Sequence, residues 1–176
     1  MKRQAAGEAL HWGVGDTFVC ATQRAGSSSM AKALGRVRIV HPEIMLSQPE
    51  KRSVMWLRNP WDRLASNLSV WRIQDPQKFV DKTVFHSWNA HWSPQTEVHS
   101  YRDIPLWNEL YMFDDLSPTW AKVFPDKILG KVNASKQRLT AQELINALKP
   151  TTVDDLVELY KEDLKLYEYK SKLAVR

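Results

Sequence analysis

The feature that most constrains the fold is a short apolar run followed at once by a loop rich in glycine and serine. Residues 17–22 are apolar and β-prone, which favours a strand, and the loop at residues 23–29 interrupts that run. The loop offers hydroxyl groups that can cap a helix, and residues 30–34 have a helical pattern that Gly35 ends. Strand, loop and helix in this order predict an α/β fold with parallel strand pairing.

Later segments continue the α/β pattern. Three further runs favour strands: residues 37–40, 53–57 and 110–113. Helices are expected over residues 77–88 and after three residues that can act as N-caps: Asn59, Thr140 and Thr152. The helix after Thr152 is predicted to run to about Tyr169, and residues 89–108 are expected to form a long loop of the kind that often carries function.

Length and composition limit the classes of protein to consider. The chain has 176 residues with 43% apolar and 26% charged side chains, which predicts one folded domain over residues 1–176 with a core at about 17–169. The single cysteine, Cys20, allows no disulfide framework, and no apolar stretch approaches the length of a membrane span. We therefore expect a cytoplasmic protein that does not associate with membranes.

The net charge of +5 suits an anionic ligand, although ordinary solubility explains so modest an excess equally well. Basic residues are scattered along the chain and form no run of five or more, which argues against a nucleic-acid-binding tail.

The loop after the first strand has the chemistry of a phosphate or sulfate cradle. Gly26 lets the backbone approach an anion, Arg24 supplies a permanent charge, and the serines that follow can donate hydrogen bonds at the start of a helix. The alternative is a serine-rich turn with one capping hydroxyl. The loop is not the nucleoside-triphosphate type, because no Gly-x-x-x-x-Gly-Lys-Ser/Thr run is present.

A second motif, Arg58-Asn59-Pro60-Trp61-Asp62-Arg63-Leu64-Ala65-Ser66, follows the strand at residues 53–57. Arg58 stands at the end of that strand, where ligands of open α/β sheets bind, and Ser66 lies about two helical turns further on. A guanidinium and a hydroxyl could converge there on one phosphate. The alternative is that Arg58 pairs with Asp62 and Ser66 faces solvent.

Together these motifs resemble the sulfotransferases that use 3′-phosphoadenosine-5′-phosphosulfate (PAPS). Segments at 79–80, 91–95, 110–116 and 159–167 are similar to the carbohydrate sulfotransferase (family 2-like) branch. The resemblance implies a three-layer, P-loop-like fold with a mostly parallel central sheet between helices. It also implies three contacts with PAPS. The 3′-phosphate would contact Arg58 and Ser66, and Lys136 would be a later basic contact. The 5′-phosphosulfate would lie on a loop made of Arg24, Ala25, Gly26, Ser27, Ser28 and Ser29.

Catalysis in such an enzyme needs a cation for the leaving phosphate and a base for the acceptor proton. Arg24 is the expected cation, since it stands where many relatives have lysine. His41 is the first candidate base, because it follows the second strand and would lie at the same sheet edge as Arg58 if the strands that precede the two residues are parallel neighbours. His91 is the second candidate, and Glu43 and Glu97 are further alternatives. No metal ligand cluster is expected for the reaction.

The function predicted from the sequence is transfer of a sulfuryl group from PAPS to an acceptor hydroxyl, with a saccharide as the leading acceptor class. Two alternatives remain open at this point: another phosphate-loop transferase such as a small kinase, and a catalytically silent module that binds PAPS or a sulfated partner.

Overall fold

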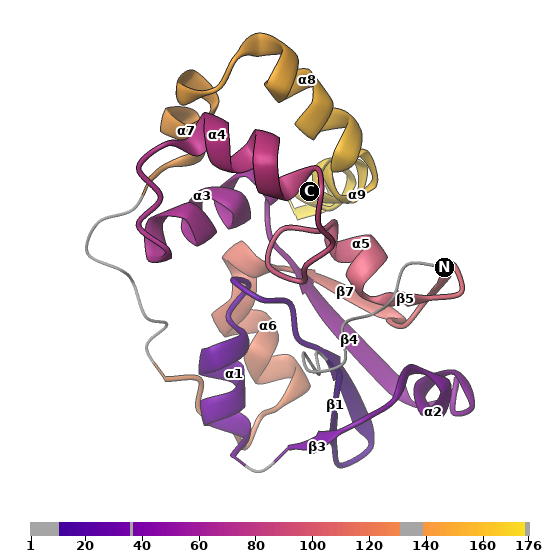
Figure 1. Cartoon of the computed structure of the whole chain (residues 1–176). Helices are drawn as coiled ribbons and strands as arrows, with labels where there is room; N and C mark the ends of the chain where they lie inside the picture. Colours follow the sequence, from indigo (N-terminus) through magenta and orange to yellow (C-terminus); the bar gives the residue numbers. More distant parts are fainter. Residues whose placement is uncertain (1–10, 36, 131–138, 175–176) are drawn as a thin grey trace.

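The computed structural model describes residues 11–35, 37–130 and 139–174. A five-stranded sheet forms its centre, in the order β3-β1-β2-β4-β7 (Figure 1). The strands are β1 (His11–Val14), β2 (Thr17–Cys20), β3 (Arg38–Ile39), β4 (Arg52–Leu57) and β7 (Glu109–Met112). A separate two-stranded ribbon pairs β5 (Ser100–Tyr101) with β6 (Ile104–Pro105).

The sheet combines a parallel half and an antiparallel hairpin. β2, β4 and β7 are parallel neighbours, whereas β1 pairs antiparallel with both β2 and β3. Four of the five strands therefore run in one direction, and β1 runs in the other. Gly15 turns the β1–β2 hairpin with a φ of 58°, a conformation that costs glycine little.

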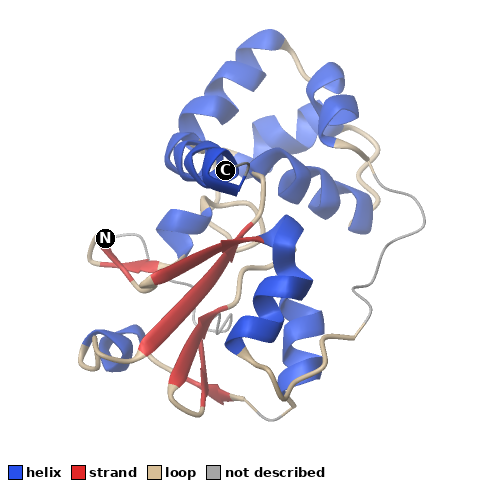
Figure 2. Cartoon of the chain, turned by 180° about the vertical axis from the view of Figure 1, so that it is seen from behind, coloured by secondary structure: helices blue, strands red, loops and turns tan. Residues whose placement is uncertain are grey.

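Helices fill both faces and one end of the sheet (Figures 1 and 2). They are α1 (Ser27–Leu34), α2 (Pro42–Leu46), α3 (Pro60–Val70), α4 (Pro76–Phe79), α5 (Gln95–Val98), α6 (Leu116–Val123), α7 (Ala141–Ala147), α8 (Pro150–Leu159) and α9 (Lys161–Ala174). A π-helical turn follows α4 at Val80–Val84, and a 3₁₀ turn at Phe113–Asp115 precedes α6. None of the helices in the described residues is long and apolar enough to cross a lipid bilayer.

Alternating side chains of β2 and β4 divide the core between the two faces of the sheet. Val19, Val54 and Trp56 face α1 and α6, where they pack in one apolar cluster with Met30 and Trp120. Phe18, Cys20, Met55 and Leu57 face the other way and pack with Met45 of α2 and Leu106.

A third apolar cluster lies among the helices at the carboxyl end of β4. Leu64 and Leu68 of α3, Leu144 of α7 and Leu156 of α8 are buried together with Trp92. The helices α3, α4, α7, α8 and α9 consequently gather above the sheet, at the end where β2 and β4 lead into their loops (Figure 1). The loops that follow β2 and β4 therefore lie between the sheet layer and this layer of helices.

The fold confirms an α/β architecture with a mostly parallel central sheet, and the predicted strands at residues 17–22, 53–57 and 110–113 correspond to β2, β4 and β7. The helix after Asn59 and the N-cap at Thr140 are also confirmed, and Thr140 forms a capping box with Glu143. The predicted helix at residues 77–88 is instead a short α-helix continued by a π-helical turn.

The predicted strand at 37–40 corresponds to β3, but it is not a neighbour of β4, because the unforeseen β1 and then β2 lie between them. Two other sequence predictions were wrong. The last helix is two helices that meet at Tyr160, and Thr152 does not cap the first of them, because Lys149 is its N-cap and Pro150 begins it. Residues 89–108 are not an open loop, since they contain α5 and the β5–β6 ribbon.

Candidate functional site

The loop between β2 and α1 has left-handed backbone at two positions. The Ala25 N–H donates to the Thr22 carbonyl at 3.1 Å, and φ is 63° at Arg24 and 83° at Gly26. α1 begins at Ser27, and its N-cap residue, Gly26, has no side chain that could accept from the first N–H groups of the helix. Such N–H groups carry partial positive charge, which is the usual basis of phosphate and sulfate binding at helix N-termini.

Gly26 is required by both its conformation and its surroundings. A Cβ atom at this position would lie 3.0 Å from Phe113 Cε2 and 3.1 Å from Leu116 Cδ2, on the segment that links β7 to α6. A side chain would also be strained at a φ of 83°. The loop can therefore lie directly against this neighbouring segment only with glycine here.

Arg58 connects the end of β4 to the same loop. Its Nη1 donates to the Arg24 carbonyl at 2.5 Å, and its guanidinium stacks over the Phe113 ring with 5.2 Å between Cζ and the ring centroid. Because β2 and β4 are adjacent and parallel, both lead to one edge of the sheet. The sequence motif that begins at Arg58 and the loop that contains Arg24 are thus brought together as expected for ligand binding at such an edge.

Arg63 is a second arginine of this motif that contacts the loop. This buried guanidinium donates to three carbonyl oxygens: Gln23 at 3.2 Å, Ser93 at 2.8 Å and Ala90 at 2.6 Å. Burial lowers the pKa of Arg63, but an arginine stays protonated under ordinary conditions. Its charge is therefore held next to the loop, and the partners that it has among the described residues are carbonyl oxygens.

Arg24 itself is half-buried, and burial lowers its pKa. Its Nε is fully buried, and no atom of the described residues accepts a hydrogen bond from it. Unsatisfied buried donors are rare in folded proteins and require an explanation. An anion held by the loop would supply the missing acceptor, so the residues present fit a phosphate or sulfate group.

A buried carboxylate organises the neighbouring segment. Asp163 of α9 accepts hydrogen bonds from the Gln95 N–H at 2.6 Å and from the Thr96 N–H and hydroxyl, both at 2.8 Å. This carboxylate caps α5 from a different helix. The Gln95 side chain in turn accepts from the Arg58 N–H at 3.1 Å and donates to the Arg58 carbonyl at 2.7 Å, which fixes the backbone where β4 ends.

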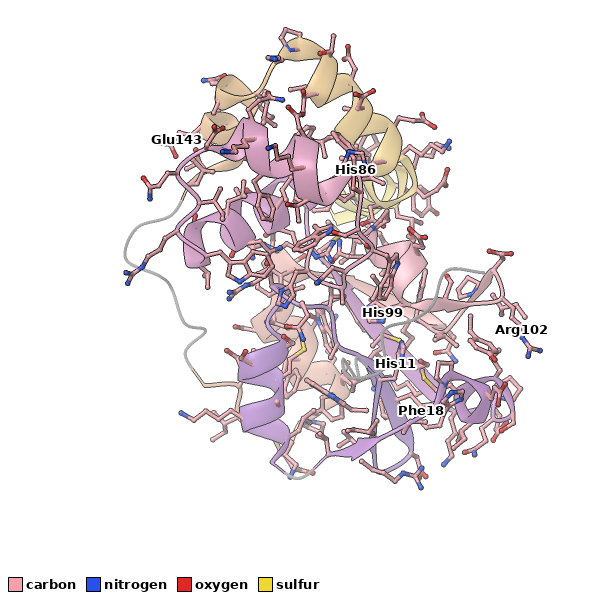
Figure 3. The ribbon with its side chains drawn as sticks, viewed as in Figure 1. His11, Phe18, His86, His99, Arg102 and Glu143 are labelled. Carbon is pink, nitrogen blue, oxygen red and sulfur yellow. The ribbon has the colours of Figure 1, made fainter. Side chains whose placement is uncertain are left out.

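Two buried histidines are in contact with each other, and one of them, His99, contacts the start of the loop (Figure 3). His99 Nε2 is 2.8 Å from the Thr22 hydroxyl, and His99 Nδ1 is 3.1 Å from His11 Nε2. Burial lowers the pKa of His11 to about 4, with a smaller contribution from the nearby His41, and burial also lowers the pKa of His99 well below its usual range. Both rings are therefore neutral near pH 7.

The two histidines expected to serve as the base lie in different places. His41 is largely exposed and is the N-cap of α2, beyond the edge strand β3, so it is not at the end of a neighbour of β4. His91 lies in the segment that Arg63 holds, and its ring is 5.2 Å from that of Trp71 in an edge-on arrangement. The segment that carries His91 is linked to the loop through the Arg63 side chain, which donates to both the Ala90 and the Gln23 carbonyl.

The remaining predicted site residues are distributed as follows. Ser27 is buried, Ser28 is exposed and Ser29 is half-buried, all in the first turn of α1, and Ala25 is buried in the loop. Ser66 lies on α3 and is partly exposed. Glu43 of α2 accepts from the Tyr101 hydroxyl at 2.7 Å, and Glu97 lies in α5. Lys136 lies outside the described residues.

Sequence reasoning missed four residues that build the site. Arg63 stands within the Arg-Asn-Pro motif and Gln95 within the His-Trp-Ser-Pro-Gln segment, so both motifs contained the signal. His99 and Asp163 had no such signal, because their hydrogen-bond partners are 77 and 68 residues away in the chain.

Comparison with protein-family models, with curated proteins and with solved structures found no match for this chain.

Proposed function

We propose that this protein is a sulfotransferase that takes the sulfuryl group of PAPS and passes it to an acceptor hydroxyl, with saccharides as the leading acceptor class by family resemblance. The observation that carries the proposal is the meeting of the Arg24 loop and Arg58 at the carboxyl edge of two parallel strands, joined by the hydrogen bond from Arg58 Nη1 to the Arg24 carbonyl.

The nucleotide would bind with its two phosphate groups on different parts of this edge. The 5′-phosphosulfate would lie on the loop from Arg24 to Ser29, where the N–H groups of the first turn of α1 and the unpaired Arg24 Nε are donors. The 3′-phosphate would lie on Arg58 and Ser66, with Lys136 as a further contact from the resemblance. The buried Arg63 charge, which is hydrogen-bonded to the Gln23 carbonyl, favours an anion on the loop.

The transfer step moves one sulfuryl group and one proton. The acceptor oxygen forms a bond to sulfur, the bond from sulfur to the 5′-phosphate oxygen breaks, and adenosine-3′,5′-bisphosphate leaves. Arg24 would stabilise the charge that develops on that leaving oxygen. A neutral histidine would take the acceptor proton, and the link through Arg63 favours His91 over His41; Glu43 and Glu97 remain candidates if neither histidine acts.

The first experiment is a calorimetric comparison of adenosine-3′,5′-bisphosphate with 5′-AMP and ATP. We expect the bisphosphate to bind more tightly than either. A hydrogen bond between a charged arginine and phosphate is worth about 1.5–3 kcal/mol, so Arg58→Ala should weaken bisphosphate binding about tenfold to a hundredfold. Arg38→Ala, which changes an exposed arginine on the edge strand β3, is the matched control and should leave affinity unchanged.

The outcomes separate the proposed function from its alternatives. Equal affinity for 5′-AMP and the bisphosphate would refute the assignment of Arg58, and preference for ATP would favour a kinase. Tight bisphosphate binding without transfer of labelled sulfate to any of a panel of saccharide acceptors would favour a silent binding module. His91→Ala and His41→Ala, assayed with an acceptor once it is found, identify the base by loss of turnover with normal bisphosphate binding.

A further inference from the structure

Three side chains of types that bind metals lie next to Thr22, at the start of the loop from Arg24 to Ser29 (the anion loop). His11 begins β1, Cys20 ends β2, and His99 follows α5, so three separate segments contribute one residue each. A nitrogen of each ring and Cys20 Sγ lie within 4.8 Å of one another, and all three residues are buried. Figure 3 shows His11 and His99 side by side beside the sheet.

The geometry points to a metal site: we propose that His11, Cys20 and His99 bind a zinc-class divalent cation. In tetrahedral zinc sites the metal–nitrogen distance is about 2.0–2.1 Å, which places two nitrogen ligands about 3.3 Å apart. His11 Nε2 and His99 Nδ1 are 3.1 Å apart, which is close to that separation. A nitrogen and a sulfur ligand lie about 3.6 Å apart on zinc, whereas Cys20 Sγ and the ring nitrogens are within 4.8 Å, so the sulfur needs to approach by at most about 1.2 Å.

The surroundings orient the ligand atoms. The Thr22 hydroxyl contacts His99 Nε2 at 2.8 Å, which leaves Nδ1 as the nitrogen that faces His11. Metal-bound histidines usually make such a hydrogen bond through their second nitrogen, and it fixes the orientation of the ring. Cys20 Sγ lies 3.6 Å from the Leu106 carbonyl, in the segment that follows the β5–β6 ribbon.

The set of two imidazoles and one thiol favours a borderline-soft ion such as Zn²⁺ over Mg²⁺ or Ca²⁺, which prefer oxygen ligands. Binding would form a metal–sulfur bond and release the thiol proton to solvent. Three protein ligands leave one position of a tetrahedron for a water molecule. The bound ion would join β1, β2 and the segment after α5, and through Thr22 it would steady the start of the anion loop.

The test uses the tag-free whole chain, since a polyhistidine tag would itself bind the probe. After removal of metals with a chelator and dialysis, the protein is titrated with Co²⁺ and its absorption spectrum is recorded. We expect one equivalent to bind, with the visible bands of tetrahedral Co²⁺ and a near-ultraviolet band from thiolate-to-metal charge transfer, and we expect Zn²⁺ to remove both. Because Cys20 is the single cysteine of the chain, a charge-transfer band in the unmodified protein can come from no other residue.

Substitutions test whether His11, Cys20 and His99 bind a metal or only pack against one another. Cys20→Ser should abolish the charge-transfer band and His99→Gln should weaken Co²⁺ binding more than about tenfold, whereas Thr22→Val should weaken it about tenfold to a hundredfold. His86→Gln, at an exposed histidine in the helical layer, is the matched control and should bind Co²⁺ normally (Figure 3).

Absence of the charge-transfer band from the unmodified protein would overturn the proposal, whether or not the variants fold. Persistence of that band in Cys20→Ser, or equal weakening by His86→Gln, would overturn it as well. Nucleotide is absent throughout, so the result is independent of the proposed sulfotransferase activity.

Discussion

Replacing Gly26 by alanine tests whether the anion loop is held in place by its contact with the segment after β7. The backbone φ of 83° makes any L side chain costly, by about 1–2 kcal/mol. The added Cβ would also lie 3.0 Å from Phe113 Cε2 and 3.1 Å from Leu116 Cδ2, and overpacking of this kind typically costs about 1–3 kcal/mol. We therefore expect Gly26→Ala to lower the free energy of unfolding by about 2–5 kcal/mol.

The same substitution should reduce nucleotide binding. The Arg58 guanidinium lies over the Phe113 ring, with 5.2 Å between Cζ and the ring centroid. A shift of Phe113 would therefore move Arg58 as well as the loop. We expect weaker binding of adenosine-3′,5′-bisphosphate under conditions in which the variant is fully folded. Urea unfolding measures the stability, and calorimetry of the folded variant measures the affinity.

Gly15→Ala is the matched control. Gly15, in the hairpin at the opposite end of β2, also has a positive φ, of 58°. Apart from its two chain neighbours, no described residue has an atom within 4 Å of the position that its Cβ would occupy. We expect Gly15→Ala to lower the free energy of unfolding only by the cost of the positive φ, about 1–2 kcal/mol, and to leave nucleotide affinity unchanged. If both variants lose the same stability, the packing argument is wrong. If Gly26→Ala binds the bisphosphate normally, the loop is not the phosphate site.

Three further predictions concern charge. Arg24→Ala should lower kcat for PAPS-dependent transfer more than it raises KM, while Arg24→Lys should keep part of the activity because it keeps the charge and loses the planar fork; a defect in KM alone would make Arg24 a binding residue only. Asp163→Asn should lower the free energy of unfolding, measured by urea unfolding, by about 2–4 kcal/mol, because the carboxylate accepts hydrogen bonds from two N–H groups and a hydroxyl. Glu162→Gln, on the exposed side of the same helix, is the control and should change it by less than about 0.5 kcal/mol. With a chelator present, the stability should fall as the pH drops from about 6.5 to 4, because burial lowers the pKa of His11 to about 4 and also lowers the pKa of His99, so the unfolded chain binds the extra protons. The His11 share is about 3 kcal/mol, and His11→Gln should make the fall smaller by that amount while the His99 share stays. A pH-independent stability over this range, or an unchanged fall in His11→Gln, would contradict the burial argument.

The parts of the site that follow from adjacent residues could be predicted from the sequence. The loop between β2 and α1 and the start of α3 are each encoded by a few neighbouring side chains, namely the Gly26 turn and the Asn59 and Pro60 cap. Local signals of this kind involve residues within one or two turns of the chain, so they can be recognised without knowledge of the fold.

The position of His41 could not be predicted in this way. Its expected place beside Arg58 assumed that consecutive strands are neighbours, but β1 forms a hairpin with β2 and inserts between β2 and β3. The pattern of β1, His11-Trp12-Gly13-Val14, is too short to stand out, because a four-residue strand offers only two alternations of side chains.

The sequence by itself determined the chemistry of the loop, the parallel course of β2 and β4 and the identity of the charged residues at their ends. Only the tertiary structure decided which of those residues meet. Arg63 reaches the loop and residues 90–93, Asp163 reaches the first turn of α5 from the last helix, and His99 reaches both Thr22 and His11. The physical reason is that a buried charge or imidazole needs hydrogen-bond partners, and packing of the core can place those partners next to it however far apart the residues are in the sequence.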